Sequence, residues 1–408
     1  MTDMNHSDAL QNPVLIVNCG SSSIKYALIG ADATHRIEGL AENLGTPDAR
    51  IKHKSATGDK SEISIPDADH TQALQSVLEQ LGDVTPVAVG HRVVHGGDVF
   101  GEATKVTPDT LAEVKNLSAL APLHNPANLA GIEAVTSIYP DLPQVMVFDT
   151  AFHQTMPEVA YRYAIPKNLY TDHAIRRYGF HGTSHAFVSN RASKLSTSAG
   201  NRDDKKGWLT AHLGNGCSVT AVYDGNSMDS SMGLTPLEGL MMGTRSGDVD
   251  PGLHGHLHRT LDMDLSEIDT MLNKKSGLLG VSTVTNDMRT IEEMASDASH
   301  EHHADAKLAL EMFCYRAGRY LASLSCALPE MTGIVFTGGI GENSSTVRAK
   351  IVGVMRQFGL KIDEAKNEVL IRGEEGSFHG DDSRYELWVI PTDEEYRICE
   401  ETRAVLDL

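Results

Sequence analysis

The sequence predicts an α/β protein that contains two similar domains. Residues 14–17 form a short apolar run typical of a buried strand, and a polar turn led by glycine separates it from a second run at 26–29. Residues 209–222 repeat this order of strand, glycine-containing polar tip and strand. Because Gly20 and Gly216, at the two tips, lie about half the chain apart, we interpret the repeat as an internal duplication.

Length and composition support this interpretation. A chain of 408 residues is too long for one hydrophobic core, which favours two domains. Its 40% hydrophobic and 22% charged residues are typical of a soluble globular protein. The formal net charge of −20 argues against nucleic acid or an anionic membrane as a partner. Any anionic substrate must therefore be bound by a local cluster of Lys, Arg and His side chains.

The N-terminus and the cysteines predict a cytoplasmic location. The first 13 residues have neither a basic start nor an apolar segment, so we expect no signal peptide. No apolar run approaches the length of about 18 residues that a transmembrane helix requires. The cysteines are odd in number and scattered, which fits free thiols in a reducing compartment: Cys19, Cys217, Cys314, Cys326 and Cys399.

The rest of the chain alternates apolar runs with segments of helical spacing. Further strands are expected at residues 87–94, 144–148 and 387–390. Helices are expected at residues 71–81, 107–120, 128–135, 186–195, 305–328 and 344–358. Residues 52–70 are polar and predict an exposed loop or a hairpin. Residues 333–343 predict a strand and a glycine loop that faces the N-terminus of the next helix, which indicates an anion and nucleotide site.

The turn after the first strand has the chemistry of a phosphate site. Gly20 allows the backbone to approach a ligand closely, and the three serines that follow it provide hydroxyl groups. Lys25 adds a positive charge. By itself this pattern is equally typical of a plain Gly/Ser hairpin turn. It is not a Walker P-loop, because Gly-Lys-Ser/Thr occurs nowhere in the chain.

Two charged residues lie on or directly after predicted buried strands. Arg92 lies inside the apolar run at 87–94, and burying an unpaired arginine is costly. It therefore either forms an ion pair in the core or points into a cleft. Asp149 follows the strand at 144–148, and ligands of open α/β sheets bind at the carboxyl ends of the strands.

An ordered set of motifs resembles the acetate kinase family and covers almost the whole chain. The motifs are VLIVNCGSSSIK, HRVVHGG, APLHNP, FDTAFHQTMP, RRYGFHGTSH, HLGNGCS, TPLEGLMMGTRSGDVDP, FTGGIGENS and VIPTDEE. The family belongs to the acetate and sugar kinase/Hsc70/actin superfamily. The resemblance therefore implies two duplicated actin-like (ribonuclease H-like) domains with an active-site cleft between them. It implies an N-terminal domain at residues 1–150 plus about 395–408, and a nucleotide-binding C-terminal domain at 151–394.

The resemblance also implies an activity. That activity is the reversible, Mg²⁺-dependent, in-line transfer of the γ-phosphoryl group of ATP to acetate, which gives acetyl phosphate and ADP. Mn²⁺ is an alternative metal, and a homodimer is implied. A propionate kinase or another short-chain acyl kinase would share every catalytic motif, and the volume of the pocket near Val94 would discriminate. An inactive ATP-binding regulator is an alternative from another class, but the intact Arg92, Asp149, Arg245 and Glu394 argue against it.

The resemblance implies roles for individual residues. The catalytic residues are Arg92, Asp149, His181 and Arg245. Acetate would contact Arg92 together with Val94, Leu123, His124, Phe180 and Pro236. The nucleotide would contact Lys25, His212, Gly214, Asn215, Gly216, Asp287, Met288, Arg289, Gly339, Ile340, Gly341, Glu342 and Asn343. The metal would be held by Asn18, Asp149 and Glu394, with Ser21, Ser23 and Lys25 in the surrounding phosphate and metal shell.

The implied chemistry fits these residue types. Acetate is ionised at neutral pH, because the pKa of a carboxylic acid is about 4, so the acceptor needs no general base. The enzyme must instead hold two anions together, and the guanidinium fork matches carboxylate and phosphate oxygens in a bidentate manner. Three positions depart from the family pattern: Cys217 replaces a usual Gly, Asp393 a frequent Asn, and Met288 a common aromatic residue. None belongs to the charged centre.

Overall fold

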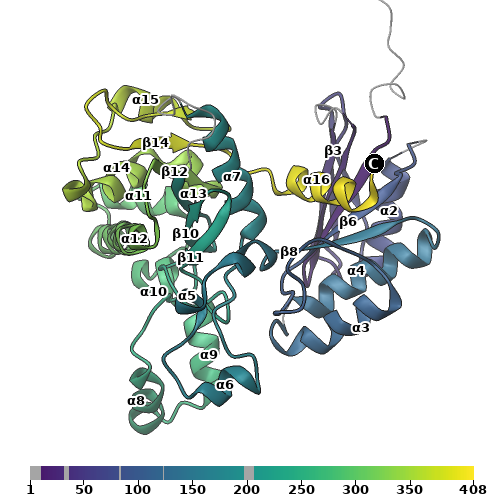
Figure 1. The fold of residues 1–408 in the computed structure, drawn as a ribbon, viewed down its shortest axis with the longest axis horizontal. Coiled ribbons are helices and arrows are strands. Elements are labelled where there is room, and N and C mark those ends of the chain that lie inside the picture. Colours follow the sequence, from purple (N-terminus) through teal and green to yellow (C-terminus); the bar gives the residue numbers. More distant parts are fainter. Residues whose placement is uncertain (1–10, 32–35, 82–83, 123, 197–205) are drawn as a thin grey trace, which may run out of the picture. The chain divides into compact units, whose positions relative to one another are not determined.

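The computed structural model describes residues 11–31, 36–81, 84–122, 124–196 and 206–408 (Figure 1). The chain divides into two compact units. Unit 1 comprises Met1–Phe152 and Asp393–Leu408, and unit 2 comprises His153–Thr392. Each unit has its own β-sheet with helices packed on it, so the chain has the α/β architecture that the sequence predicts.

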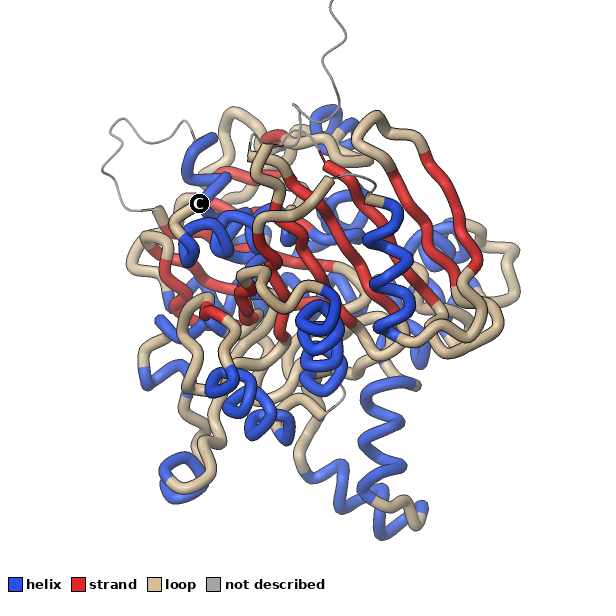
Figure 2. The backbone as a smooth tube through the Cα atoms, turned by 90° about the vertical axis from the view of Figure 1, so that its right-hand side faces the viewer, coloured by secondary structure: helices blue, strands red, loops and turns tan. Residues whose placement is uncertain are grey.

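Unit 1 contains an eight-stranded sheet with the order β5-β4-β3-β2-β1-β6-β8-β7. Strand β1 is antiparallel to β2 and parallel to β6, which is in turn parallel to β8. Figure 2 shows strands of the structure side by side, in red. The strands are β1 Val14–Cys19, β2 Ser23–Ile29, β3 Arg36–Glu42, β4 Arg50–Lys54, β5 Lys60–Ser64, β6 Ala88–Val93, β7 Thr104–Lys105 and β8 Gln144–Phe148. The polar segment at 52–70 therefore forms a hairpin, β4–β5, rather than a loop.

Helices cover both faces of this sheet. Successive residues of β1 point to opposite faces, so Leu15 packs in one cluster with helices α2 and α4, and Ile16 packs in another with α16. A Cβ on Gly90 of β6 would lie only 2.4 Å from Thr402 Oγ1, so glycine is what lets α16 approach the sheet this closely. The helices are α2 His70–Gln80, α3 Pro108–Asn116, η1 Leu117–Ala119, α4 Asn125–Ile138 and α16 Glu394–Leu406.

Unit 2 repeats this design with a six-stranded sheet of order β11-β10-β9-β12-β14-β13. Strands β9 and β10 are antiparallel, whereas β12 is parallel to both β9 and β14. The order β11-β10-β9-β12-β14 matches β3-β2-β1-β6-β8 of unit 1, so the internal duplication is confirmed. The strands are β9 Gly207–Leu213, β10 Cys217–Tyr223, β11 Asn226–Ser230, β12 Gly333–Thr337, β13 Gly376–Ser377 and β14 Glu386–Val389.

The structure corrects one residue pairing within the duplication. Cys19 ends β1 and Leu213 ends the equivalent strand β9, so Gly20 corresponds to Gly214 rather than to Gly216. The sequence signal placed the match at the wrong glycine because the second tip contains glycine at both of its ends.

The helices of unit 2 lie on both faces of its sheet (Figure 1). Val188 of α7 packs with Trp208 of β9 and Val335 of β12, while α12 contacts β9 and β10. The short helix η2, Ala151–Thr155, spans the boundary between the units. The helices of unit 2 are α5 Glu158–Tyr161, α6 Lys167–Thr171, α7 Gly182–Leu195, α8 Gly252–Leu261, α9 Leu265–Lys274, α10 Gly277–Ser282, α11 Met288–Ser296, α12 His303–Leu324, η3 Ser325–Ala327, α13 Gly338–Asn343, α14 Ser345–Val354, η4 Arg356–Phe358 and α15 Glu364–Val369.

The expected glycine loop after β12 is instead a short helix, α13. Gly338 adopts a left-handed conformation with φ of 78°, which turns the chain from the strand into the helix. The carboxylate of Glu342 then accepts hydrogen bonds from Gly338 N at 2.8 Å and from Thr337 Oγ1 at 3.1 Å. These bonds satisfy donors at the start of the helix, which explains why a segment rich in glycine is helical.

Two further observations concern the described residues only. In these ranges no helix combines the length and the hydropathy that spanning a bilayer requires. All five cysteines are free thiols, four of them buried and Cys326 exposed.

Buried His91 gives the fold a testable pH dependence. His91 is 2% exposed, and its Nε2 contacts Gln144 Oε1 at 2.7 Å. Burial lowers the pKa of His91 to about 4. An unfolded histidine has a pKa of about 6.5, so the unfolded state binds a proton that the folded state rejects. The contribution of neutral His91 to the free energy of unfolding is therefore fully present above about pH 6.5. It is lost as the pH drops towards 4, by about 3 kcal/mol in all.

Urea unfolding of the wild type and of His91→Gln at pH 7.5 and pH 5 checks this expectation. Between pH 7.5 and pH 5, the urea concentration at the unfolding midpoint should decrease more for the wild type than for the variant, because glutamine does not titrate. Equal losses in the two proteins would show that His91 does not carry the effect.

Candidate active site

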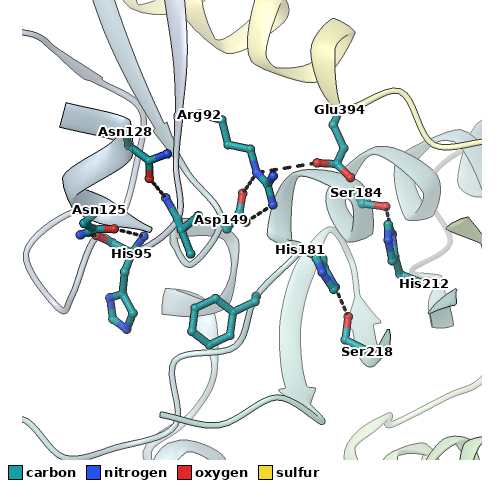
Figure 3. A network of polar contacts seen from close by, with 12 residues as sticks. Arg92, His95, Asn125, Asn128, Asp149, His181, Ser184, His212, Ser218 and Glu394 are labelled. Carbon is teal, nitrogen blue, oxygen red and sulfur yellow. Dashed lines mark hydrogen bonds and ion pairs between the residues drawn. The ribbon is translucent and has the colours of Figure 1, made fainter. Parts of the chain in front are cut away.

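The charged centre of unit 1 lies where β6 and β8 end. Arg92 pairs with Val147 in the register of these parallel strands, and Asp149 follows β8 directly. The guanidinium of Arg92 donates from Nε to Asp149 Oδ1 at 2.8 Å and from Nη2 to Oδ2 at 2.6 Å (Figure 3). This bidentate geometry holds the fork in one orientation. Of the two fates that the sequence allowed for Arg92, the structure shows the ion pair.

Glu394 joins this pair from the first turn of α16. Its Oε2 lies 3.9 Å from Arg92 Nε. Burial and the nearby charge of Asp149 raise the pKa of Glu394, although Arg92 opposes the shift. Burial disfavours the charge on Arg92, but Asp149 and Glu394 outweigh it and raise the pKa of the guanidinium. The centre therefore contains two carboxylates, Asp149 and Glu394, for one guanidinium.

The oxygen donors of this centre fit a small divalent cation. Asp149 and Glu394 provide carboxylates, and the predicted third ligand, Asn18, lies near the end of β1, which pairs with β6. These two carboxylates share the single guanidinium of Arg92, so the three side chains together carry a net negative charge. Within the described part of the chain no group of three or more His, Cys, Asp or Glu could hold a metal ion. A pair of carboxylates matches Mg²⁺, which takes one or two from the protein and completes its shell with water and phosphate.

Two asparagines of α4 fix the backbone beside this centre (Figure 3). Asn128 accepts from Val94 N at 3.0 Å and donates to Cys19 O at 2.8 Å, so it ties the end of β6 to the end of β1. Asn125 accepts from His95 N at 3.2 Å and donates to His95 O at 3.0 Å. The sequence predicted a helix at residues 128–135 but not these hydrogen bonds. Of the two acetate contacts predicted in this segment, His124 caps α4, while Leu123 lies outside the described residues.

The histidine centre of unit 2 forms around the start of α7. His181 precedes the helix in a left-handed conformation with φ of 56°. Its Nδ1 lies 2.8 Å from Ser218 Oγ, and its ring stacks on that of His212 with a centroid distance of 4.4 Å (Figure 3). Ser184 Oγ in turn contacts His212 Nδ1 at 2.8 Å. The buried residue Phe180 precedes His181, and its carbonyl contacts His153 Nε2 at 2.9 Å.

Arg245 is a half-buried cation without a carboxylate partner among the described residues. Its Nη1 donates to the carbonyl of Pro236 at 3.1 Å and lies 3.8 Å from Met242 Sδ. Burial lowers the pKa of Arg245, and only the Cys217 thiol opposes the shift. A Cβ on Gly216 would lie 3.5 Å from both Arg245 Nη1 and His181 Nε2, so both groups face the backbone of Gly216. A desolvated cation without a counter-charge is typical of an anion site.

Beside the β9–β10 tip lies a cavity of about 770 Å³, a size typical of small-molecule sites. The N-terminal ends of α11, α13 and α14 border it, which favours an anionic ligand. The predicted nucleotide residues in its lining are Gly214, Asn215, Asp287, Met288, Arg289, Gly339, Ile340 and Asn343. The sequence analysis missed Asn286, Glu292, Ser344, Ile371 and Arg372, which also line it.

The family model described as the acetokinase family matches residues 13–400. The chain belongs to this family. An acetate kinase of Stutzerimonas stutzeri is 54% identical over 398 residues, which cover 97% of this chain and 98% of that protein. A propionate kinase structure from Francisella tularensis has a TM-score of 0.90 and 42% identity and covers 97% of this chain and 100% of its own.

An acetate kinase structure from Porphyromonas gingivalis has a TM-score of 0.89 and 43% identity, with coverage of 97% of this chain and 100% of its own. These matches confirm the resemblance stated from the motifs. They also confirm the predicted fold class, two duplicated actin-like domains.

Several predicted nucleotide residues of this acetokinase family member do not line the cavity. Lys25 lies on β2 of unit 1, where its Nζ forms an ion pair with Glu395 Oε1 at 2.5 Å. Glu342 points to backbone, because its Oε1 also accepts from Thr392 N at 3.1 Å. The other residues outside the lining are His212, Gly216 and Gly341.

One buried cation that the sequence analysis missed joins two walls of the cavity. Arg348 of α14 has no exposed surface, and burial lowers its pKa to about 10. It donates to Gly341 O at 2.9 Å and to Leu370 O at 3.0 Å. These bonds hold α13 next to the segment that carries Ile371 and Arg372. Nothing in the local sequence signals this role, because the two carbonyls are far apart in the chain.

Proposed function

We propose that this chain is an acetate kinase, an ATP:acetate phosphotransferase that reversibly transfers the γ-phosphoryl group of ATP to acetate. The observation that carries the proposal is Arg245, a desolvated cation that faces the same glycine tip as the nucleotide-sized cavity. The names of the relatives support the choice of acetate as acceptor.

In the proposed reaction, unit 2 binds the nucleotide and stabilises the transferring group. The cavity beside α13 and α14 takes ATP or ADP, and the helix N-termini favour the phosphates. Arg245 and His181 provide hydrogen-bond donors for the oxygens of the phosphoryl group as charge spreads over them. Acetate arrives ionised, so no residue needs to remove a proton from it.

Unit 1 supplies the second set of charges. Arg92 binds the carboxylate of acetate, and Asp149 holds the guanidinium in the required orientation. As a kinase the protein needs a divalent metal, and we propose Mg²⁺, with Mn²⁺ as an alternative, held by Asp149, Glu394 and Asn18. The bound metal supplies charge neutralisation for the phosphate groups. The domain boundaries at 150–151 and about 395, the homodimer and the cytoplasmic location stay predictions, and the two units support the first of them.

An assay for acetyl phosphate tests the proposal. Purified protein with ATP, Mg²⁺ and acetate should form an acyl phosphate that hydroxylamine traps as acetohydroxamate, with one ADP per hydroxamate. Reactions without acetate, and reactions with EDTA in excess over Mg²⁺, are the controls. Binding of ATP by calorimetry together with no hydroxamate would instead favour an inactive ATP-binding regulator.

Propionate is the second candidate acceptor, because the similar structure from Francisella tularensis is that of a propionate kinase. Val94 is the predicted determinant. It is 9% exposed, and its backbone is fixed by Asn128 Oδ1 at 3.0 Å.

We expect Val94→Ala to enlarge the acyl pocket and to raise the ratio of kcat/KM for propionate over acetate by roughly tenfold, the effect of about one methylene group. Steady-state kinetics with both acids measures this ratio. The matched control is Val93→Ala, since Val93 is fully buried and belongs to the core cluster with Phe100 and Phe148. An unchanged ratio in Val94→Ala would remove Val94 from the acyl pocket.

A further inference from the structure

A continuous chain of polar contacts runs from His181 into the core of unit 2. His181 Nδ1 lies 2.8 Å from Ser218 Oγ, which lies 2.7 Å from His185 Nε2. On its other side, His185 Nδ1 lies 2.7 Å from Thr210 Oγ1. The chain ends where Thr210 Oγ1 donates to the carbonyl of Thr220 at 3.3 Å. Ser218, His185 and Thr210 are fully buried, so water does not compete with these contacts.

The hydrogen bond from Thr210 to the carbonyl of Thr220 determines which group donates in each of the other contacts. If the Thr210 hydroxyl donates to Thr220 O, its oxygen accepts from His185 Nδ1–H. A neutral imidazole carries one proton, so His185 Nε2 then accepts from the Ser218 hydroxyl. The Ser218 oxygen in turn accepts from His181 Nδ1–H. The opposite direction would forfeit the bond to Thr220 O, so this direction makes one more hydrogen bond.

His185 is neutral, as this direction of the hydrogen bonds requires. Burial lowers the pKa of His185 well below its usual value, and the neighbouring rings of His153 and His212 lower it further. The ring centroid of His153 lies 5.9 Å away and that of His212 lies 6.3 Å away. His185 is therefore neutral at neutral and alkaline pH.

We propose that Ser218, His185 and Thr210 are positioning residues that keep the proton of neutral His181 on Nδ1. His181 Nε2, which faces Gly216, then carries a proton only in the imidazolium form of the ring. His181 donates to the transferring phosphoryl group as a cation and loses this bond when the imidazolium deprotonates. This inference rests on the proposed function, because it gives a protonation state to a residue of that reaction.

The groups around His181 in unit 2 belong to three elements. His185 lies on the same helix with a centroid distance of 6.5 Å, and His212 of β9 stacks on the ring. Arg245, in the loop at 242–247, faces the backbone of Gly216, as His181 does. His185 is neutral, so Arg245 is the fixed positive charge on this side, and an anionic phosphoryl group between the two cations stabilises both.

The pH profile of Ser218→Ala tests the proposal. In the wild type, kcat should fall on the alkaline side as His181 loses its Nε2 proton. In the variant the hydroxyl that accepts from Nδ1–H is absent, so neutral His181 can carry the proton on Nε2. We expect kcat to be roughly tenfold below the wild type at acid pH, the equivalent of about one lost hydrogen bond, and the difference to shrink as the pH rises. A ratio of wild type to variant that is constant with pH would indicate a merely structural role and overturn the proposal.

A second readout does not depend on activity. In protein labelled with ¹⁵N-histidine, His181→Gln identifies the His181 signals, and the neutral ring should show a pyrrole-type Nδ1 and a pyridine-type Nε2. Ser218→Ala should mix the two tautomers. The matched control is Ser231→Ala, which removes a buried hydroxyl bonded to Val219 N and should leave both readouts unchanged. A wild-type ring protonated on Nε2 when neutral would overturn the proposal. If neutral His181 carries its proton on Nδ1 but the protein forms no acetyl phosphate, the result would instead overturn the proposed function.

Discussion

Replacing Arg245 by alanine should lower kcat at least about 10²-fold, a loss of roughly 3 kcal/mol or more of transition-state stabilisation. The guanidinium has no carboxylate partner among the residues that the structure describes, and burial lowers its pKa. An arriving phosphoryl group therefore meets a cation that has already lost water and that no carboxylate neutralises. Charge spreads over the equatorial oxygens in the transition state, so the loss should fall on kcat rather than on ATP affinity.

Two further variants sharpen this prediction. Arg245→Lys should recover little activity, because an ammonium group lacks the planar fork. Arg289 is a matched arginine, since it lines the cavity but is 85% exposed and forms a salt bridge with Asp287 at 3.3 Å. Arg289→Ala should raise the KM for ATP and leave kcat nearly unchanged. Near-normal kcat with weakened ATP binding in Arg245→Ala, measured by calorimetry, would assign Arg245 to the nucleotide site instead.

The arrangement of the strands and the charged centre of unit 1 follow from local signals. The two strand pairs with polar tips showed the duplication, because apolar runs bounded by glycine are visible in the sequence. Arg92 and Asp149 lie on or directly after neighbouring parallel strands, whose carboxyl ends meet at one edge of the sheet. The sequence analysis placed each residue at its own strand, and the contact between them follows from the pairing of β6 with β8, which it did not predict.

The features that the sequence did not show depend on tertiary contacts. Ser218 and His185 each end a motif that the sequence shows, but their contact exists only because α7 packs on the sheet that contains β10. Arg348 joins Gly341 to Leu370 through backbone carbonyls, which every residue type possesses. The helix α13 replaced an expected loop because hydrogen bonds to the Glu342 carboxylate offset the low helix propensity of glycine.

Asp149→Asn should lower kcat/KM for acetate by about 10²- to 10³-fold. Asp149 is 1% exposed, and each of its oxygens accepts a bond from Arg92. An amide keeps one acceptor but turns an N–H towards a guanidinium donor, so the fork loses its bidentate partner and its neutralising charge. Losing one preorganised electrostatic contact of an active site costs about 10²- to 10³-fold in rate, which sets the size of the expected loss. Mg²⁺ affinity should fall as well, because the remaining carboxylate of Glu394 would act without Asp149.

Acetate kinetics and Mg²⁺ titration of the variant measure both effects. Glu400→Gln is the matched control, since Glu400 lies on the same helix α16 but pairs with Arg397 at 3.6 Å, and its loss should cost little activity. Circular dichroism establishes that each variant is folded before its kinetics are compared. The acid limb of the wild-type profile should follow acetate ionisation and metal binding, because the acceptor needs no base. A limb near neutral pH that disappears in Asp149→Asn, with Mg²⁺ affinity unchanged, would make Asp149 a general base and contradict this mechanism.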